Sequence, residues 1–132
     1  MTPAERVTAY YDDLRTGDAD RIARHFTEDA VHWFTRREPE HGARTIARDA
    51  ALAVEQLGAV WTLEHLVAND DEAAIEWSMA YDHPRSGRRV MDRGAELFAF
   101  RDGRISEVRA YYAERGGDLV GFDHAARGHS TL

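Results

Sequence analysis

The stretch from Glu96 to Tyr112 reads ELFAFRDGRISEVRAYY and contains the strongest hairpin signal in the chain. Apolar and polar residues alternate on both sides of Arg101-Asp102-Gly103, a pattern typical of two antiparallel strands joined by a tight turn. We therefore expect this hairpin to form part of a sheet, with one apolar face and one polar face.

Two registers of this hairpin fit the sequence. A two-residue turn at Asp102-Gly103 places Phe98 opposite Glu107, whereas a three-residue loop with a bulge at Gly103 places Phe98 opposite Ser106. A one-residue slip moves every side chain to the other face, so we prefer the three-residue loop, which separates apolar from charged residues. The apolar face then carries Glu96, Phe98, Phe100, Val108, Ala110 and Tyr112, and the other face carries Arg101, Glu107 and Arg109. A carboxylate on an apolar surface is the most informative feature of this pattern.

Composition limits the classes of function. The chain has 132 residues, of which 43% are hydrophobic and 31% charged, as expected for one globular domain. Its net charge of -7 argues against nucleic acid and anionic membranes as partners. There is no cysteine, which excludes disulfides and thiol chemistry. The N-terminus has no apolar signal region and no run approaches ~18 apolar residues, so we expect a cytoplasmic protein.

The first half of the chain carries helix signals. Thr2-Pro3-Ala4-Glu5 is a capping box that begins a helix ending at Gly17, and Asp18 can cap a second short helix. A turn at Thr27-Glu28-Asp29 then leads to a short strand from Ala30 to Phe34. After a polar loop, a third helix ends at Gly58; its apolar stripe consists of Ile46, Ala50, Val54 and Leu57.

The second half alternates with period two and is predicted to form strands at Val60 to Ala68, Ala73 to Tyr81 and Val90 to Phe100. In the first of these strands the side chains expected to face inward are Trp61, Leu63, His65 and Val67. In the second strand they are Ile75, Trp77, Met79 and Tyr81. Helices followed by antiparallel strands indicate the α+β class, with helices on one face of a curved sheet that encloses an apolar pocket. Residues 1–112 form the domain. Residues 113–132 are a tail, with Leu119, Val120 and Phe122 expected to pack on it.

Three segments carry a resemblance to a known family: HFTEDAVHWF from His25 to Phe34, HGARTIA from His41 to Ala47, and FRDGRISEVRAYY from Phe100 to Tyr112. They resemble the SnoaL-like branch of the NTF2-like superfamily, over roughly Ala4 to Tyr112. The resemblance implies a cone of three N-terminal helices on a strongly curved mixed sheet, and a homodimer paired through the outer sheet face. It does not fix the activity, because the superfamily includes isomerases, epoxide hydrolases, cyclases, dehydratases and non-catalytic binding modules.

Two enzyme types of the superfamily can be compared position by position. In ketosteroid isomerase the oxyanion-binding tyrosine matches Tyr10, and the protonated aspartic acid beside it matches Glu96. The catalytic base of that enzyme matches Phe34, so the base is missing here. The epoxide hydrolases have polar residues at five positions, and four of these have lost their polar group in this chain, so that activity is not expected. Those five positions are His32, Phe34, Trp77, Met79 and Ala110.

His32 and Glu96 are the predicted proton carriers. An imidazole exchanges protons near neutral pH, and a glutamic acid among apolar side chains either keeps its proton or is held ionised by the imidazole. Tyr10 could donate a hydrogen bond to a developing oxyanion. Each of these residues also has a purely structural explanation. His32 could be a core histidine bonded to a backbone carbonyl, Glu96 could form a salt bridge or lie at the pocket mouth, and Tyr10 could only pack in the core. The residues expected to line the core or the pocket are Phe34, Trp61, His65, Trp77, Met79, Tyr81, Phe98, Val108 and Tyr112.

The leading hypothesis is a small enzyme without a cofactor that acts by general acid/base catalysis on an apolar or aromatic small molecule. The reaction would be an isomerisation, cyclisation or dehydration. The seven histidines show no metal-ligand spacing, so no metal is expected. The alternative is a non-catalytic binding or dimerisation module of the same fold. Catalysis requires His32 and Glu96 to face one cavity, whereas a binding module would have them turned apart or already bonded to backbone.

Overall fold

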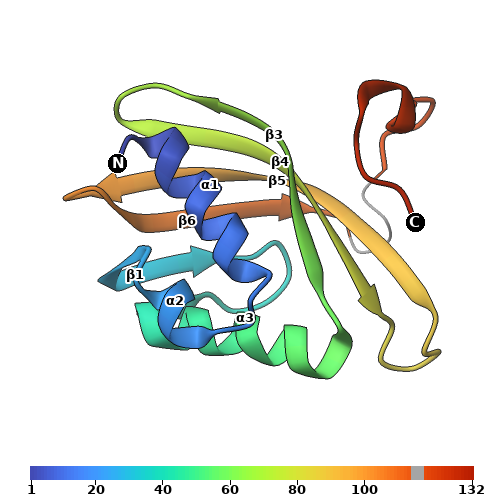
Figure 1. Ribbon diagram of the computed structural model, residues 1–132, viewed down its shortest axis with the longest axis horizontal. Coiled ribbons are helices and arrows are strands. Elements are labelled where there is room, and N and C mark those ends of the chain that lie inside the picture. Colours follow the sequence, from blue (N-terminus) through green and yellow to red (C-terminus); the bar gives the residue numbers. More distant parts are fainter. Residues whose placement is uncertain (114–117) are drawn as a thin grey trace.

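The computed structural model describes residues 1–113 and 118–132. Within these ranges three helices precede or interrupt a sheet of six strands (Figure 1). The helices are α1 (Pro3–Leu14), α2 (Ala19–Ala23) and α3 (Ala43–Leu57). The strands are β1 (Phe26–Trp33), β2 (Glu40–His41), β3 (Val60–Ala68), β4 (Glu72–Asp82), β5 (Arg89–Arg101) and β6 (Arg104–Tyr112). A short 3-10 turn spans Ala125–Arg127.

The helix ends follow the predicted caps. The Thr2 side chain accepts a hydrogen bond from the Glu5 amide, and the Glu5 carboxylate accepts one from the Thr2 amide, which completes the capping box of α1. Asp18 accepts bonds from two amides at the start of α2. Gly58 ends α3 in the left-handed region, at φ 59°. In the described part of the chain no helix is both long and apolar enough to span a membrane.

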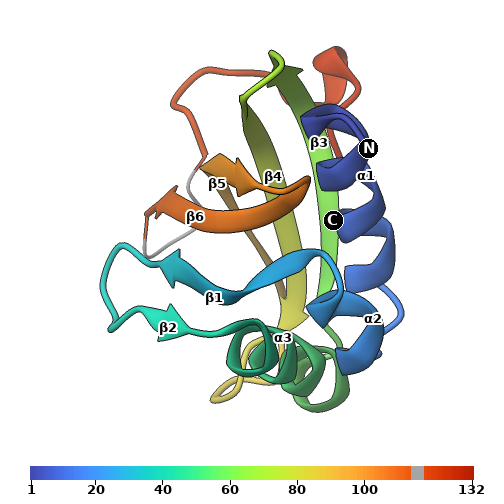
Figure 2. The same cartoon turned by 90° about the vertical axis from the view of Figure 1, so that its left-hand side faces the viewer.

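The strands form one mixed sheet in the order β2-β1-β6-β5-β4-β3. β1 runs parallel to β6, and every other neighbouring pair is antiparallel. The sheet curves strongly, and the three helices lie on its concave side (Figure 2). The predicted α+β fold, a cone of helices on a curved mixed sheet, is therefore confirmed.

The hairpin has the predicted faces but a different turn. Arg101 pairs with Arg104, and both turn residues have positive φ, 53° at Asp102 and 76° at Gly103. These are the values of a two-residue type I′ turn, so the predicted three-residue loop is wrong. A register shift next to Ala99 then restores the apolar face, because it sets Phe98 opposite Val108 and Glu96 opposite Ala110. The two-residue turn and the bulge together place apolar and charged side chains on opposite faces of the hairpin. This separation was the reason for preferring the three-residue loop.

A second irregularity changes the faces of β3. The register shifts between Leu63 and His65, after which Leu66 lies opposite Ile75. His65 and Val67 are consequently exposed, and Leu66 packs against the core in their place. The prediction that His65 and Val67 point inward is wrong, since strict alternation does not anticipate a bulge.

The first strand is also longer than predicted. Residues 27–29, predicted to form a turn, lie inside β1, and the polar loop after it contains the two-residue strand β2. β2 pairs with β1, placing Glu40 opposite His32. The loop thus returns Glu40 to the sheet edge, beside the predicted site.

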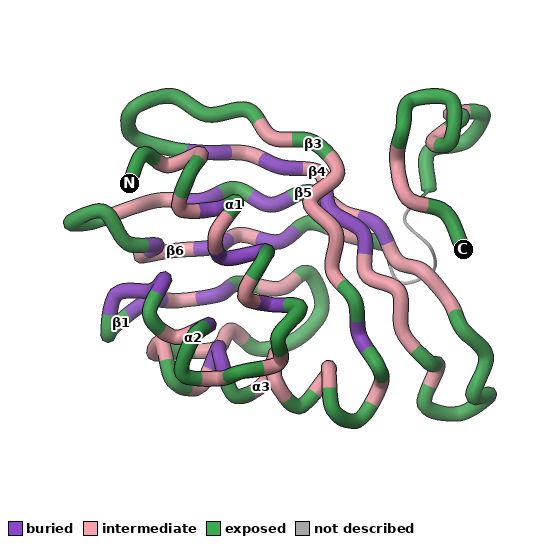
Figure 3. The backbone as a smooth tube through the Cα atoms, viewed as in Figure 1, coloured by how far each residue is buried: buried purple, intermediate pink, exposed green. Residues whose placement is uncertain are grey.

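Buried residues follow the concave side of the sheet and the inner faces of the helices (Figure 3). Trp77 of β4 lies directly opposite Gly94 of β5. A Cβ on Gly94 would lie 2.6 Å from the Trp77 ring and 2.6 Å from the Tyr111 carbonyl oxygen. Glycine is required there because the indole occupies the space that any side chain would need.

The described part of the tail, residues 118–132, lies against the sheet through polar contacts. Arg93 is 8% exposed and donates from Nε to Asp118 at 2.8 Å and from Nη2 to the Ser130 carbonyl oxygen. The Ser130 amide donates to Glu64. Burial alone would raise the pKa of Glu64, but hydrogen bonds from Ser130 and Ser78 outweigh it and lower that pKa. Leu119 and Val120 are 57% and 106% exposed, so their predicted packing is wrong, whereas Phe122 is partly buried.

Candidate functional site

A cavity of about 390 Å³ opens between α1, α3 and the concave side of the sheet. Helix α1 contributes Tyr10, Tyr11 and Leu14, and the apolar residues that α3 contributes include Ile46, Ala50, Ala53 and Leu57. The strands contribute His32 of β1, Trp61 of β3, Trp77 and Met79 of β4, Asp92 and Glu96 of β5, and Ala110 and Tyr112 of β6. Most of the lining is apolar, so the few polar groups determine what chemistry the cavity can perform.

Three polar side chains meet at the inner end of the cavity. The Tyr11 hydroxyl donates to Glu96 Oε1 at 2.6 Å, and His32 Nε2 lies 3.5 Å from Glu96 Oε2. Glu96 is 6% exposed and His32 is 7% exposed. One carboxylate oxygen is therefore fixed by the phenol while the other faces the imidazole, as a buried carboxylate requires.

The tyrosine that contacts Glu96 is Tyr11, the neighbour of Tyr10, which is the predicted oxyanion donor. Successive residues of a helix point about 100° apart, so only one of the two can reach the carboxylate. The Tyr10 ring packs edge-on against Tyr11 and Phe26, with centroids 5.4 and 5.0 Å away, and Tyr10 still lines the cavity. Burial and the negative charge of Glu96 raise the pKa of both phenols well above the usual range, so both stay protonated.

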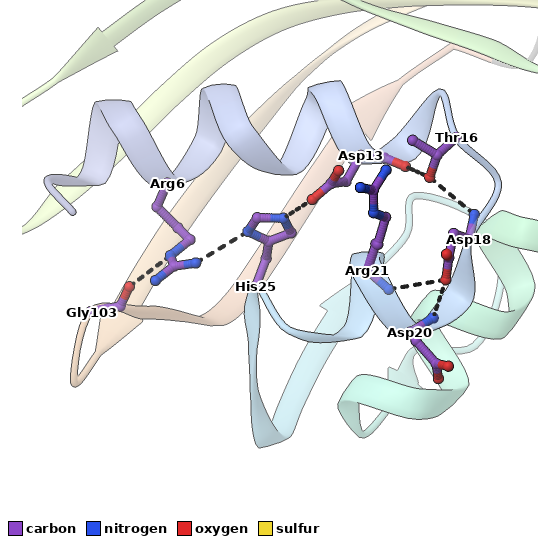
Figure 4. A network of polar contacts seen from close by, with 8 residues as sticks. All are labelled: Arg6, Asp13, Thr16, Asp18, Asp20, Arg21, His25 and Gly103. Carbon is purple, nitrogen blue, oxygen red and sulfur yellow. Dashed lines mark hydrogen bonds and ion pairs between the residues drawn. The ribbon is translucent and has the colours of Figure 1, made fainter.

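His32 differs from the other buried histidine of the first half, His25. Both ring nitrogens of His25 have partners: Arg6 Nη1 lies 3.2 Å from Nδ1, and Asp13 Oδ2 lies 2.7 Å from Nε2 (Figure 4). Because arginine can only donate, Nδ1 is the acceptor and Nε2 carries the proton. Nδ1 of His32 is buried without any partner in the described residues, although the ring lies in the cavity wall. His25 is thus fully used in structure, whereas His32 keeps one free nitrogen.

A second polar group lies on the cavity wall between the loop, β2 and α3. Arg37 Nη2 is 2.9 Å from Asp49 Oδ2 and 3.5 Å from Glu40 Oε1. The Arg37 guanidinium also lies 3.8 Å over the centre of the Phe34 ring. Burial, together with the neighbouring Asp49, raises the pKa of Glu40 to about 7, and Arg37 offsets this only in part.

The structure brings together many but not all of the predicted site residues. In addition to His32, Glu96 and Tyr10, those that line the cavity are Phe34, Trp61, Trp77, Met79 and Tyr112. Phe98 and Val108 lie in the core beneath it, 2% and 0% exposed. Tyr81 does not line the cavity; its hydroxyl donates to Oδ2 of the lining residue Asp92 at 2.8 Å. His65 is on the outside, for the reason given above.

Some lining residues were not predicted. Asp92 lies on the same face of β5 as Glu96, so period-two alternation could have identified it. Asp49 lies one turn after Ile46 on α3, a helical spacing that also gave a usable signal. Glu40 had no such signal, because its position depends on a two-residue strand within a loop.

Comparison with known proteins places this architecture in a family. The sequence model of the SnoaL-like domain matches residues 7–108. No curated protein matches the chain. A protein of unknown function with a cystatin-like fold from Methylobium petroleophilum PM1 is 32% identical, with a TM-score of 0.74, over 98% of this chain and 91% of that chain.

Two further solved structures share the fold at lower identity. A hypothetical protein with a ketosteroid isomerase-like fold from Catenulispora acidiphila DSM 44928, in complex with trimethylamine, is 17% identical with a TM-score of 0.76, over 98% of this chain and 96% of that chain. SalBIII, an epoxide hydrolase/cyclase-like enzyme in pyran ring formation, is 20% identical with a TM-score of 0.73, over 85% of this chain and 91% of that chain. The match of the family model across most of the domain, together with the shared fold, shows that this chain belongs to the SnoaL-like domain family.

Proposed function

We propose that this protein is a cofactor-independent enzyme that performs general acid/base catalysis on an apolar or aromatic small molecule held in the cavity. The observation that carries the proposal is the pairing of two proton carriers at one cavity wall, His32 Nε2 at 3.5 Å from Glu96 Oε2. This arrangement favours catalysis over the alternative of a non-catalytic binding module, in which the two groups would be turned apart or bonded to backbone.

Each polar group of the cavity has a role in such a reaction. One member of the His32–Glu96 pair removes a proton from the substrate, and the other returns a proton at a second atom, so no net charge is left behind. Tyr11 is a positioning residue, since its hydrogen bond to Oε1 leaves Oε2 facing the imidazole. Isomerisation needs only such a paired proton transfer. In cyclisation the pair accompanies formation of the ring bond, and in dehydration the returned proton leaves with the hydroxyl as water when the C–O bond breaks.

Two unused hydrogen-bonding atoms support a polar group on the ligand. Nδ1 of His32 and Nε1 of Trp77 are both buried without a partner in the described residues, and both rings line the cavity. The indole N–H can only donate, so an oxygen of the ligand is its natural partner. A buried polar atom without a partner costs about 1–3 kcal/mol. A ligand oxygen or N–H could recover this cost only if neighbouring side chains move aside, because both atoms are covered in the structure.

The fold is compatible with this chemistry in related proteins. SalBIII, which shares the fold, is described as acting in pyran ring formation, and ring closure combines removal of a proton with addition of one. A cyclase-type or isomerase-type reaction is therefore the step that we expect for this cavity.

The proposal can be tested without knowing the natural substrate. The protein is incubated in deuterium oxide with a panel of apolar ketones such as 2-indanone and 1-tetralone, and deuterium incorporation next to the carbonyl is followed by NMR. We expect exchange above the buffer rate for at least one ketone. His32→Gln and Glu96→Gln should each slow it by about 10²-fold or more, the usual contribution of an acid/base group.

Matched substitutions on the outside of the protein serve as controls. His65→Gln and Glu28→Gln change the same residue types at exposed positions and should leave exchange within about twofold of wild type. Exchange that persists in both cavity variants, or that is absent for every ketone, would contradict the proposed catalysis.

We also propose that the protein is a homodimer that pairs through the outer face of the sheet. Several large apolar side chains are exposed on the strands of that face: Trp33 at 42%, Val67 at 56%, Leu97 at 37% and Tyr111 at 56%. Leu97 and Tyr111 alternate with the inward-facing Glu96 and Tyr112, so they point away from the cavity. Exposed apolar residues gathered on one sheet face are typical of an interface.

A further inference from the structure

The polar residues around the cavity are predominantly acidic. The lining contains the four carboxylates Glu40, Asp49, Asp92 and Glu96, one guanidinium, that of Arg37, and one imidazole, that of His32. Between these carboxylates the walls are aromatic, formed by Phe34, Trp61, Trp77 and Tyr112. Carboxylates combined with aromatic faces are the chemistry that recognises organic cations, because both attract positive charge.

We propose that the molecule bound in this cavity carries a positively charged amine, held between Glu40 and Asp49, with its apolar body extending along the aromatic walls toward Glu96. This inference rests on the proposed function and specifies the substrate class of the same site. An anionic ligand is disfavoured, because only one permanent cation of the described lining could pair with it.

The two carboxylates Glu40 and Asp49 share one cationic partner, Arg37, so a second cation could pair with them. One guanidinium serves both carboxylates, and it does so unequally, at 2.9 Å from Asp49 and 3.5 Å from Glu40. The side chain of Glu40 is only 15% exposed, whereas that of Arg37 is 51% exposed. The buried carboxylate therefore depends on a surface arginine for neutralisation, and a desolvated ligand amine would serve it better.

The neighbouring rings already hold a cation in the required geometry. The Arg37 guanidinium lies 3.8 Å over the Phe34 ring, and Phe34 stacks on His32 with a centroid separation of 4.3 Å. His32 gives an independent sign of a ligand, since it is 7% exposed, lines the cavity and has an Nδ1 without a partner among residues 1–113 and 118–132.

Binding of a cation should strengthen as Glu40 ionises. The groups that face Glu40 are Arg37 from the loop, Asp49 from α3, Tyr10 from α1 and His32 from β1. Since burial and Asp49 raise the pKa of Glu40 to about 7, the carboxylate gains its full charge only above neutral pH. A permanent cation should therefore bind more tightly at about pH 8 than at about pH 6.

The test compares two probes of the same shape. Phenyltrimethylammonium is a permanent cation, and tert-butylbenzene is its uncharged carbon isostere. Binding to the full-length protein is followed by the NMR signals of the three indole N–H groups. We expect the cation to bind about tenfold more tightly or better. Its titration should shift the signals of Trp61 and Trp77, which line the cavity, and not that of the exposed Trp33.

Charge-removing variants locate the cation. Asp49→Asn and Glu40→Gln should each lower the preference for the cation over the isostere by about three- to tenfold. Asp70→Asn removes the same charge from an exposed turn and should leave that preference unchanged. The preference in wild type should also decrease from about pH 8 to about pH 6, and this decrease should be absent in Glu40→Gln.

Two results would overturn the inference. If the isostere binds as tightly as the cation, the ligand class is wrong, while the cavity remains a site for apolar molecules. If neither probe shifts Trp61 or Trp77, the amine class is likewise wrong. Neither result decides the proposed catalysis, because the deuterium-exchange assay uses uncharged ketones and tests His32 and Glu96 directly.

Discussion

At the scale of single residues, neighbouring side chains of the same type have different surroundings. Tyr10 and Tyr11 are both 4% exposed, yet only the Tyr11 hydroxyl has a hydrogen-bond partner among the described residues, Glu96. His25 and His32 are likewise both buried, but His25 has both nitrogens engaged, whereas Nδ1 of His32 has no partner in the part of the chain that the structure describes. These differences decide which member of each pair can take part in chemistry.

The two tyrosines can be distinguished by removing one oxygen from each. Tyr11→Phe leaves Glu96 Oε1 without its donor inside a buried site, so we expect the free energy of unfolding to fall by about 1–3 kcal/mol. Tyr10→Phe removes no hydrogen bond seen in the described residues and should change the free energy of unfolding by about 0.5 kcal/mol or less. Urea unfolding of both variants measures the difference. Equal losses, or a larger loss in Tyr10→Phe, would contradict the assignment of Tyr11.

Glu40 gives a prediction for the pH dependence of stability. Its pKa is about 7 in the folded protein, above the ordinary value of 4.5, so folding favours the protonated form. The stabilisation is complete below the ordinary value and is lost as the pH rises through about 7. Glu40→Gln lacks this titration. Its free energy of unfolding relative to wild type should therefore increase from about pH 5 to about pH 8, by about 1 kcal/mol because solvent still reaches part of the Glu40 side chain and screens its charge.

Urea unfolding of both proteins at several pH values provides the measurement. Asp70→Asn, at an exposed turn, is the control and should follow the wild-type profile. A difference between Glu40→Gln and wild type that does not vary with pH would contradict the raised pKa.

At the scale of elements, the sequence predicted where the helices and most strands lie but not where the strands are irregular. The capping box at Thr2 and the glycine at the end of α3 are local signals, and the structure confirms them. The register shifts between Leu63 and His65 and between Ala99 and Phe100 depend on pairing with neighbouring strands, which no single strand encodes. The same limit decided which site residues could be predicted. Period-two alternation identified Glu96, whereas Glu40 reaches the cavity only because β2 pairs with β1.

Gly94 shows how one strand position sets the shape of the cavity. Gly94→Ala would place a methyl group 2.6 Å from the Trp77 ring, which must then move. We expect a loss of about 1–3 kcal/mol in the free energy of unfolding, together with a shifted indole N–H signal for Trp77. Ala95→Gly, at the exposed neighbouring position, is the control. A Gly94→Ala variant with wild-type stability and an unmoved Trp77 signal would show that the space at Gly94 is not needed.

At the scale of the whole molecule, the two faces of the sheet have different tasks. The helices cover the concave face of the sheet (Figures 1 and 2). The cavity lies on this face, and the opposite face carries exposed apolar residues. Residues 118–132 cover part of this opposite face, where Arg93 and Glu64 bind them. The surface left for the proposed dimer is therefore centred on β5 and β6 rather than on the whole sheet.

The proposed dimer predicts a specific effect of a surface charge. Tyr111→Lys places an ammonium on the outer face of β6, among the exposed apolar residues, and should shift sedimentation from dimer to monomer, weakening association by about tenfold or more. Val120→Lys, at a fully exposed tail position, should leave the dimer intact. Monomeric wild-type protein at micromolar concentration, or a dimer unaffected by Tyr111→Lys, would contradict this interface.

The most direct test of the central claim, that His32 and Glu96 face a ligand in one cavity, is to observe all seven histidine rings while an apolar ketone is added. Ring-nitrogen NMR of histidine-labelled protein with 2-indanone provides this measurement. We predict a saturable shift of the His32 signals, with His25 and the exposed His65 unchanged. A bound ketone that leaves His32 unmoved, or that shifts histidines outside the cavity instead, would contradict the account.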